Sequence, residues 1–79
     1  MKRIPAKYLT KRVAVTWIDP TGYINSDLKD VDVSECVSEG TLVSVNERRL
    51  VLRTAVYRDS EFGDYSAISM GCVEKCVLI

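Results

Sequence analysis

The chain has 79 residues, of which 47% are hydrophobic and 28% are charged, and its eleven basic side chains balance its eleven acidic ones. This length allows one domain, and this composition excludes an intrinsically disordered chain. No run of apolar residues approaches the roughly 18 that a membrane-spanning helix needs, so we expect a cytoplasmic protein without a membrane partner.

Residues 1–11 are predicted to form a basic N-terminal arm outside the domain, which would occupy residues 12–79. Residues 1–12 contain five basic side chains and no acid, whereas residues 13–79 contain six basic side chains against eleven acidic ones, a net charge of −5. Such an arm is either solvated and frayed, or it touches an anionic partner. In the second case, the side chains that would contact phosphate groups are Lys2, Arg3, Lys7, Lys11 and Arg12.

A first strand is predicted over residues 11–19, "KRVAVTWID", where β-branched and aromatic side chains alternate. Val13, Val15 and Trp17 share one face of this strand. The tetrapeptide "DPTG" then ends it, because proline cannot donate a hydrogen bond to a ladder and glycine permits a reversal.

A long loop is predicted next, because "YINSDLKDVDVS" over residues 23–34 keeps neither a helical nor a strand period. A turn of helix is expected near residues 26–29. Carboxylates gather in and just after this loop: Asp27, Asp30, Asp32 and Glu35. They lack the glycine and the twelfth-position glutamate of a calcium-binding loop, so we expect a solvated acidic loop and no metal site.

Two further strands, over residues 35–45 and 49–57, are separated by a short link. This spacing predicts an antiparallel hairpin. In the first of the two strands, Gly40 interrupts the pattern, which indicates a bulge or a sharp bend. In the second, Leu50 and Leu52 begin the face that we expect to point into the core.

The last part of the chain predicts a strand over residues 65–69, a single 3₁₀ turn at 70–72 and a closing strand over 73–79. The final residues, "CVLI", also fit a prenylation signal. The alternation in "VEKCVLI" and the absence of a nearby polybasic run favour the strand.

The residues that carry most enzyme chemistry are absent or poorly spaced. The chain has no histidine, which removes the usual general base near neutral pH. Its three cysteines, Cys36, Cys72 and Cys76, are an odd number without a secretory signal, so we expect structural thiols in a reducing environment. The spacing of Cys72 and Cys76 does not suit a zinc site. We therefore expect no catalytic residue, no metal and no cofactor.

The order of these elements, with a long loop after the first strand and a 3₁₀ turn before the last, resembles an SH3-like barrel. The fold class is thus predicted to be all-β: a small, five-stranded, antiparallel and partly open barrel. More narrowly, "VTWIDPTGYI", "ECVSEGTLVSVNERRLVLRTAVYRD" and "YSAISMGCVEKCVLI" are similar to small uncharacterised proteins of phage and prophage regions. Those proteins often carry Ile-Pro where this chain has Ile68-Ser69. The resemblance implies fold and source and brings no assigned activity.

Two kinds of binding function follow from these residues. The first is a protein-interaction or assembly module whose aromatic side chains form a groove for a proline-rich or basic peptide. Its lining would be Trp17, Tyr23, Tyr57, Phe62 and Tyr65. Self-association, with the basic arm of one copy on the acidic loop of another, belongs to the same class. The alternative is nucleic-acid binding, in which the arm, helped by Arg48, Arg49 and Arg53, contacts phosphates while tyrosines stack on bases.

Overall fold

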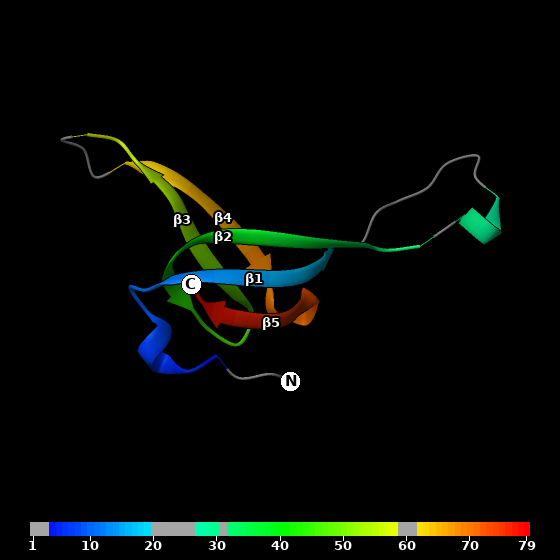
Figure 1. The fold of residues 1–79 in the computed structure, drawn as a ribbon, viewed down its shortest axis with the longest axis horizontal. Helices are drawn as coiled ribbons and strands as arrows, with labels where there is room; N and C mark the ends of the chain where they lie inside the picture. The colour runs from blue at the N-terminus through cyan, green and yellow to red at the C-terminus, as the bar shows by residue number, and fades with distance from the viewer. Residues whose placement is uncertain (1–3, 20–26, 31, 59–61) are drawn as a thin grey trace.

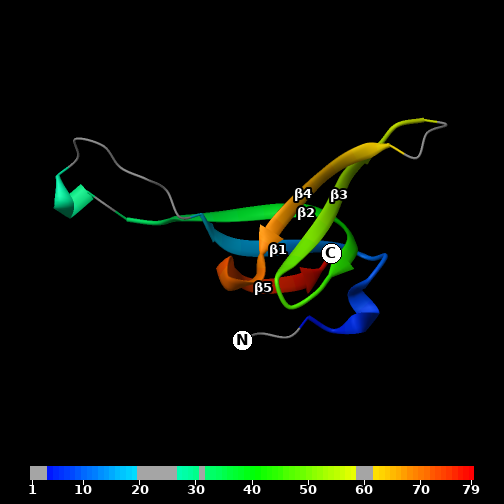
Figure 2. The same cartoon turned by 180° about the vertical axis from the view of Figure 1, so that it is seen from behind.

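A computed structural model describes residues 4–19, 27–30, 32–58 and 62–79. In these ranges, five antiparallel strands form one partly open sheet in the order β4-β3-β2-β1-β5 (Figures 1 and 2). The strands are β1 (Arg12–Asp19), β2 (Ser34–Val45), β3 (Arg49–Val56), β4 (Gly63–Ser69) and β5 (Val73–Leu78). Short 3₁₀ turns are η1 (Ala6–Tyr8), η2 (Leu28–Asp30) and η3 (Met70–Cys72). The predicted all-β antiparallel architecture is confirmed, with η3 where a 3₁₀ turn was expected.

Strand β2 belongs to two ladders. Its first part, residues 34–41, pairs with β1 from Ser34 opposite Asp19 to Thr41 opposite Arg12. From Thr41 onward it pairs with β3, so this one strand passes from one half of the sheet to the other. Figure 1 shows β2 running along β1 and then curling over at its end. The curl is what partly closes the sheet around its apolar face.

The sequence predicted a bulge or a sharp bend at Gly40, and the bulge of β2 does not lie there. Gly40 is in regular register opposite Val13, and the register shift comes later, between Leu42 and Ser44. Glycine is required at position 40 for another reason. A Cβ atom there would lie 2.9 Å from the Arg53 carbonyl oxygen and 3.2 Å from the Leu52 Cβ. This close approach depends on how β3 crosses β2, which the local sequence does not encode.

The core lies on the inner face of this sheet. The apolar residues buried in the described ranges come from β1, β2, β3, β4 and η3: Val13, Val15, Leu42, Leu50, Leu52, Ile68 and Met70. The prediction that Leu50 and Leu52 face inward is confirmed. Trp17, Val73 and Cys76 are half-buried and pack around the edge of this cluster.

Residues 4–11, which the sequence set apart as an arm, contact the core in this structure. Ile4 and Tyr8 pack against the buried cluster. The Thr10 amide donates to the Leu42 carbonyl oxygen at 2.8 Å, and the Leu42 amide donates to the Lys11 carbonyl oxygen at 2.9 Å. Thr10 adopts a positive φ of 69°, an uncommon conformation for a β-branched residue. Lys2 and Arg3 lie outside the described residues.

The C-terminal residues form an edge strand. Cys76 lies opposite Val15 and Leu78 opposite Val13, both in β1. The Ile79 amide extends the ladder by donating to the Arg12 carbonyl oxygen at 3.1 Å. The strand interpretation of the "CVLI" tail is thus confirmed. As for membrane spans, the described ranges hold no helix of the length and apolarity that crossing a bilayer requires.

Candidate binding surfaces

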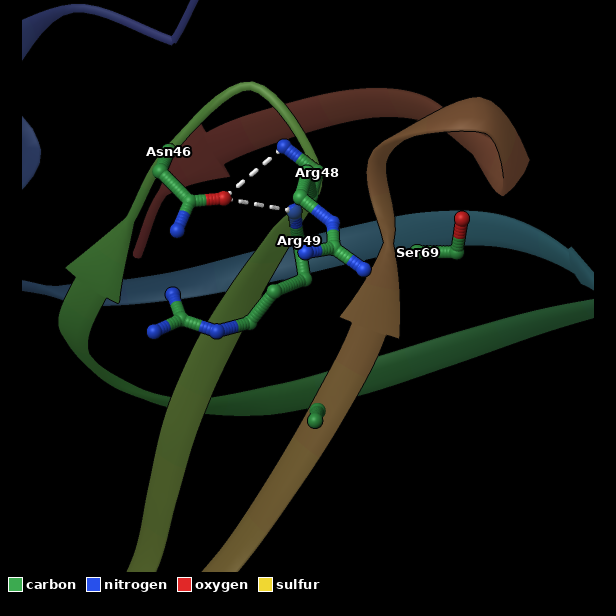
Figure 3. A pocket seen from close by; sticks show the side chains of 5 residues that line it. Asn46, Arg48, Arg49 and Ser69 are labelled. Carbon is green, nitrogen blue, oxygen red and sulfur yellow. Dashed lines mark hydrogen bonds between the residues drawn. The ribbon is translucent and has the colours of Figure 1, made fainter.

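An open pocket of about 490 Å³ lies beside the turn between β2 and β3 (Figure 3). Its lining residues are Asn46, Arg48, Arg49, Ala67 and Ser69. The Asn46 Oδ1 atom accepts hydrogen bonds from the amides of Arg48 and Arg49, at 2.8 and 3.0 Å. The Met70 amide donates to the Arg48 carbonyl oxygen at 2.9 Å, which ties the end of β4 to the turn. These bonds fix the backbone that presents both arginines.

The polar groups in this pocket are mostly hydrogen-bond donors. The Arg49 guanidinium donates to the Ser44 hydroxyl at 3.0 Å, while the Arg48 side chain extends from the turn on the side of Ser69 (Figure 3). No acidic side chain lines the pocket. Within the described residues, neither guanidinium forms an ion pair. The pocket is therefore suited to an anionic group, for which guanidinium supplies several donors.

Sequence reasoning named Arg48 and Arg49 but missed the rest of the pocket. Asn46 was detectable, because an asparagine just before a turn commonly accepts a hydrogen bond from the backbone amide two residues on, as Asn46 does from Arg48. Ser69 was not detectable, since it reaches the pocket only through the pairing of β4 with β3, where it lies opposite Arg49.

Register places two more arginines on the same outward side of the sheet as Arg49. Arg12, Thr41, Arg53 and Tyr65 form one row across β1, β2, β3 and β4. Arg53 and Arg49 are on the same outward face of β3, roughly 13 Å apart along the strand. We call the side chains of Arg12, Arg48, Arg49 and Arg53 the arginine surface. This surface contains Arg12, one of the predicted phosphate contacts, and the three arginines of the hairpin. Two other predicted phosphate contacts, Lys7 and Lys11, are exposed in the segment before β1.

The far end of the β3 and β4 hairpin carries a second group of exposed side chains. Val56, Tyr57, Phe62 and Tyr65 are each more than half exposed, and Phe62 reaches 75%. We call them the aromatic tip. The Tyr57 amide donates to the Phe62 carbonyl oxygen at 3.1 Å, and the Tyr57 hydroxyl donates to the Asp64 carboxylate at 2.7 Å. That carboxylate raises the pKa of Tyr57, because deprotonation would remove the donor and place two negative charges together.

The predicted aromatic groove is divided by the fold. Tyr57 and Phe62 lie side by side at the aromatic tip on the face of Asp64, and Tyr65 lies on the other face of the same hairpin. Trp17 lies near the end of β1 that points away from this hairpin (Figures 1 and 2). The Trp17 ring is half-buried against the core, and its Nε1 atom donates to the Ser38 hydroxyl at 3.0 Å. Trp17 therefore has a packing role. Tyr23 lies outside the described residues.

The cysteines occupy half-buried positions. Cys36, Cys72 and Cys76 all carry free thiols. Cys76 packs against the core, and burial raises the pKa of its thiol. Within the described ranges, no group of three or more histidine, cysteine or carboxylate side chains is arranged to hold a metal ion.

A comparison of the chain with models of known families, with curated proteins and with solved structures found no match. Its function is therefore inferred from its own residues.

Proposed function

We propose that this chain is a non-catalytic protein-interaction module, built as an SH3-like barrel of the kind found in small phage and prophage proteins. The sheet order supports the barrel, because β1 lies between β2 and β5, and η3 leads directly into β5. The length of the segment between β1 and β2, residues 20–33, supports it as well. The phage or prophage source is proposed from the resemblance of the sequence to small proteins of phage and prophage regions.

The aromatic tip is the observation that carries this proposal. A hairpin end that keeps four large apolar side chains in water exposes surface that association with a partner would bury favourably. Aromatic residues are also the common anchors of protein interfaces. Tyr65 lies directly opposite Arg53, so the face of the tip that carries Tyr65 offers a cation beside an aromatic side chain. We therefore propose a partner that presents an apolar side chain next to a carboxylate, rather than the basic or proline-rich peptide that the sequence suggested.

Phe62→Ala is expected to weaken partner binding by about 2 kcal/mol, roughly thirtyfold, as removal of a central interface anchor does. The partner is first identified by placing a photoreactive phenylalanine analogue at position 62 and analysing the cross-linked product. The affinities of the wild type and of Phe62→Ala for that partner are then compared by calorimetry.

The control places the same photoreactive residue at Lys29 in η2, a position that both views show apart from the sheet (Figures 1 and 2). A partner that cross-links from position 62 and not from position 29 would support the aromatic tip. Equal cross-linking from both positions, or an unchanged affinity in Phe62→Ala, would contradict it.

The arginine surface favours a second candidate function, the binding of single-stranded nucleic acid. Such sites combine positive charge along the phosphate backbone with aromatic side chains on which bases stack. Arg12 and Arg53 share a row with the exposed Tyr65, which provides both elements on one face. Lys7 and Lys11 would add contacts from the segment before β1.

We expect Arg49→Ala combined with Arg53→Ala to weaken oligonucleotide binding and to reduce the salt dependence. For single strands, each lost phosphate contact lowers the slope of log K against log salt by about 0.7, so the double variant should lose about 1.4. The measurement is fluorescence anisotropy with a labelled oligothymidine at several salt concentrations. Lys29→Ala is the control for the loss of a positive charge outside the arginine surface, and it should leave the slope unchanged. No binding by the wild type at low salt would eliminate nucleic acid as the ligand.

A further inference from the structure

The outward side of the other half of the sheet, formed by β5, β1 and β2, is apolar at its centre. Val37 is 65% exposed, Ile79 57% and Val77 44%. Register brings them close together: Val37 lies opposite Thr16, and Val77 opposite Ala14. The Ile79 amide bonds to Arg12. We define the outer apolar face by the residues Ala14, Ile18, Val37, Val77 and Ile79.

The alternation of β1 shows that this face is separate from the core. Val13 and Val15 are fully buried on the inner side, so Ala14, which lies between them, points outward. Thr16 follows on the same outward side and is only 8% exposed. In many antiparallel sheets, the outward side is polar. Here β-branched apolar side chains occupy it on both neighbours of β1, which concentrates exposed apolar surface in one place.

Charged side chains border the outer apolar face with opposite signs on its two sides. Glu35 and Glu39 lie on β2, opposite Ile18 and Ala14 of β1. Lys75 lies on β5, opposite Thr16. Thr16, the partner of Lys75, is midway along β1 between Ile18 and Ala14, the partners of the two glutamates. Measured along the strands, Lys75 is therefore roughly 7 Å from the level of each glutamate.

This charge pattern is self-complementary for one symmetric arrangement of two copies. A two-fold axis parallel to the strands lays β2 of one copy over β5 of the other, so Lys75 of the second copy lies between Glu35 and Glu39 of the first. The same axis brings the two Arg12 side chains together at the end of the face, one repulsive contact against the two Lys75 contacts that the symmetry repeats. An in-plane axis across the strands would instead lay β2 over β2 and bring Glu35 against Glu39 of the second copy. Like charges that face each other in this way repel. The charged rim of the face, formed by Glu35, Glu39 and Lys75, therefore favours the first arrangement.

We propose that the outer apolar face is the interface of a two-fold symmetric dimer of this chain. The two sheets pack face to face about 10 Å apart, as in β-sandwiches, and the same patch is used on both copies. Three short strands offer only a few hundred Å² per copy, below the roughly 800 Å² of a standard stable interface, so the dimer should be reversible at about micromolar concentrations or above. This inference goes beyond the proposed function and leaves the aromatic tip available for a partner.

The first test measures the molecular mass by sedimentation equilibrium over a range of protein concentrations. We expect the wild type to rise from the monomer mass of 8.9 kDa toward twice that value. Val37→Asp should raise the dissociation constant at least tenfold. The matched control is Val56→Asp, an identical change at an exposed valine of the aromatic tip, which should dimerise like the wild type. Amide NMR spectra of both variants establish that each is folded.

The second test reverses the rim charges. Lys75→Glu should weaken the dimer about tenfold, and the triple variant Lys75→Glu, Glu35→Lys, Glu39→Lys should restore the dissociation constant to near the wild-type value. A loss of fold cannot produce such a restoration.

A wild type that stays monomeric at millimolar concentration, a Val37→Asp variant that dimerises normally, or a triple variant that stays as weak as Lys75→Glu would each overturn the proposal. Phe62→Ala separates this inference from the proposed function, because it should weaken partner binding and leave the dimer unchanged.

Discussion

Replacing Leu52 with alanine is expected to lower the free energy of unfolding by about 2 to 5 kcal/mol. Leu52 is fully buried at the middle of β3, beside Leu42 and Leu50 in the core. The change removes apolar atoms and leaves a cavity that neighbouring strands can only partly fill. A domain of 79 residues is stabilised by roughly 4 to 12 kcal/mol in total, so the variant should lose a large share of its stability.

Urea denaturation followed by the fluorescence of Trp17 measures this loss, because Trp17 is the single tryptophan and packs against the core. Val56→Ala is the control, since Val56 is in the same strand but is mainly exposed; its effect should be within about 0.5 kcal/mol. Similar losses in the two variants would show that the inner face of β3 has been misassigned.

Gly40→Ala is expected to destabilise the domain by about 1 to 3 kcal/mol. The usual effect of this change in a strand has the opposite sign, because alanine loses less conformational entropy than glycine on folding. At position 40 the new Cβ would lie 2.9 Å from the backbone oxygen of Arg53. Relief requires β2 and β3 to separate where the strand passes between its two ladders, and that shift would loosen the core around Leu52.

Gly71→Ala provides the matched comparison. Its Cβ would meet the Ser69 hydroxyl at 3.8 Å, an ordinary contact, so we expect no loss of stability. Thermal unfolding of both variants gives the difference. If Gly40→Ala were as stable as Gly71→Ala, the close approach of β3 to Gly40 could not be as tight as described.

The strands could be predicted from the sequence because each is specified locally. Alternation in β3 identified the buried face, and the short link after β2 predicted the hairpin that β2 and β3 form. The same reasoning located the turn at η3 and the closing strand. Part of the candidate site was also local, since Tyr57, Phe62 and Tyr65 flank a single turn.

The rest depends on contacts between distant segments. Both faces of β1 are apolar in sequence, so alternation alone could not show that Ala14 and Ile18 belong to an exposed surface shared with Val37 and Val77. Trp17 looked like a groove residue until its bond to Ser38 revealed a packing role. The pocket beside Arg48 exists only because η3 is tied to the turn between β2 and β3.

Because β2 pairs with both β1 and β3, the two halves of the sheet should unfold together. Residues 34–41 hold β1, and through β1 they hold β5, whereas the residues from Thr41 onward hold β3 and β4. Separating either half of the sheet would bend the backbone of β2, and the other half needs that backbone in place to keep its own hydrogen bonds. The domain should therefore lose both halves in one cooperative transition, and the amides of β2 near Thr41 should exchange with solvent only when the whole molecule unfolds.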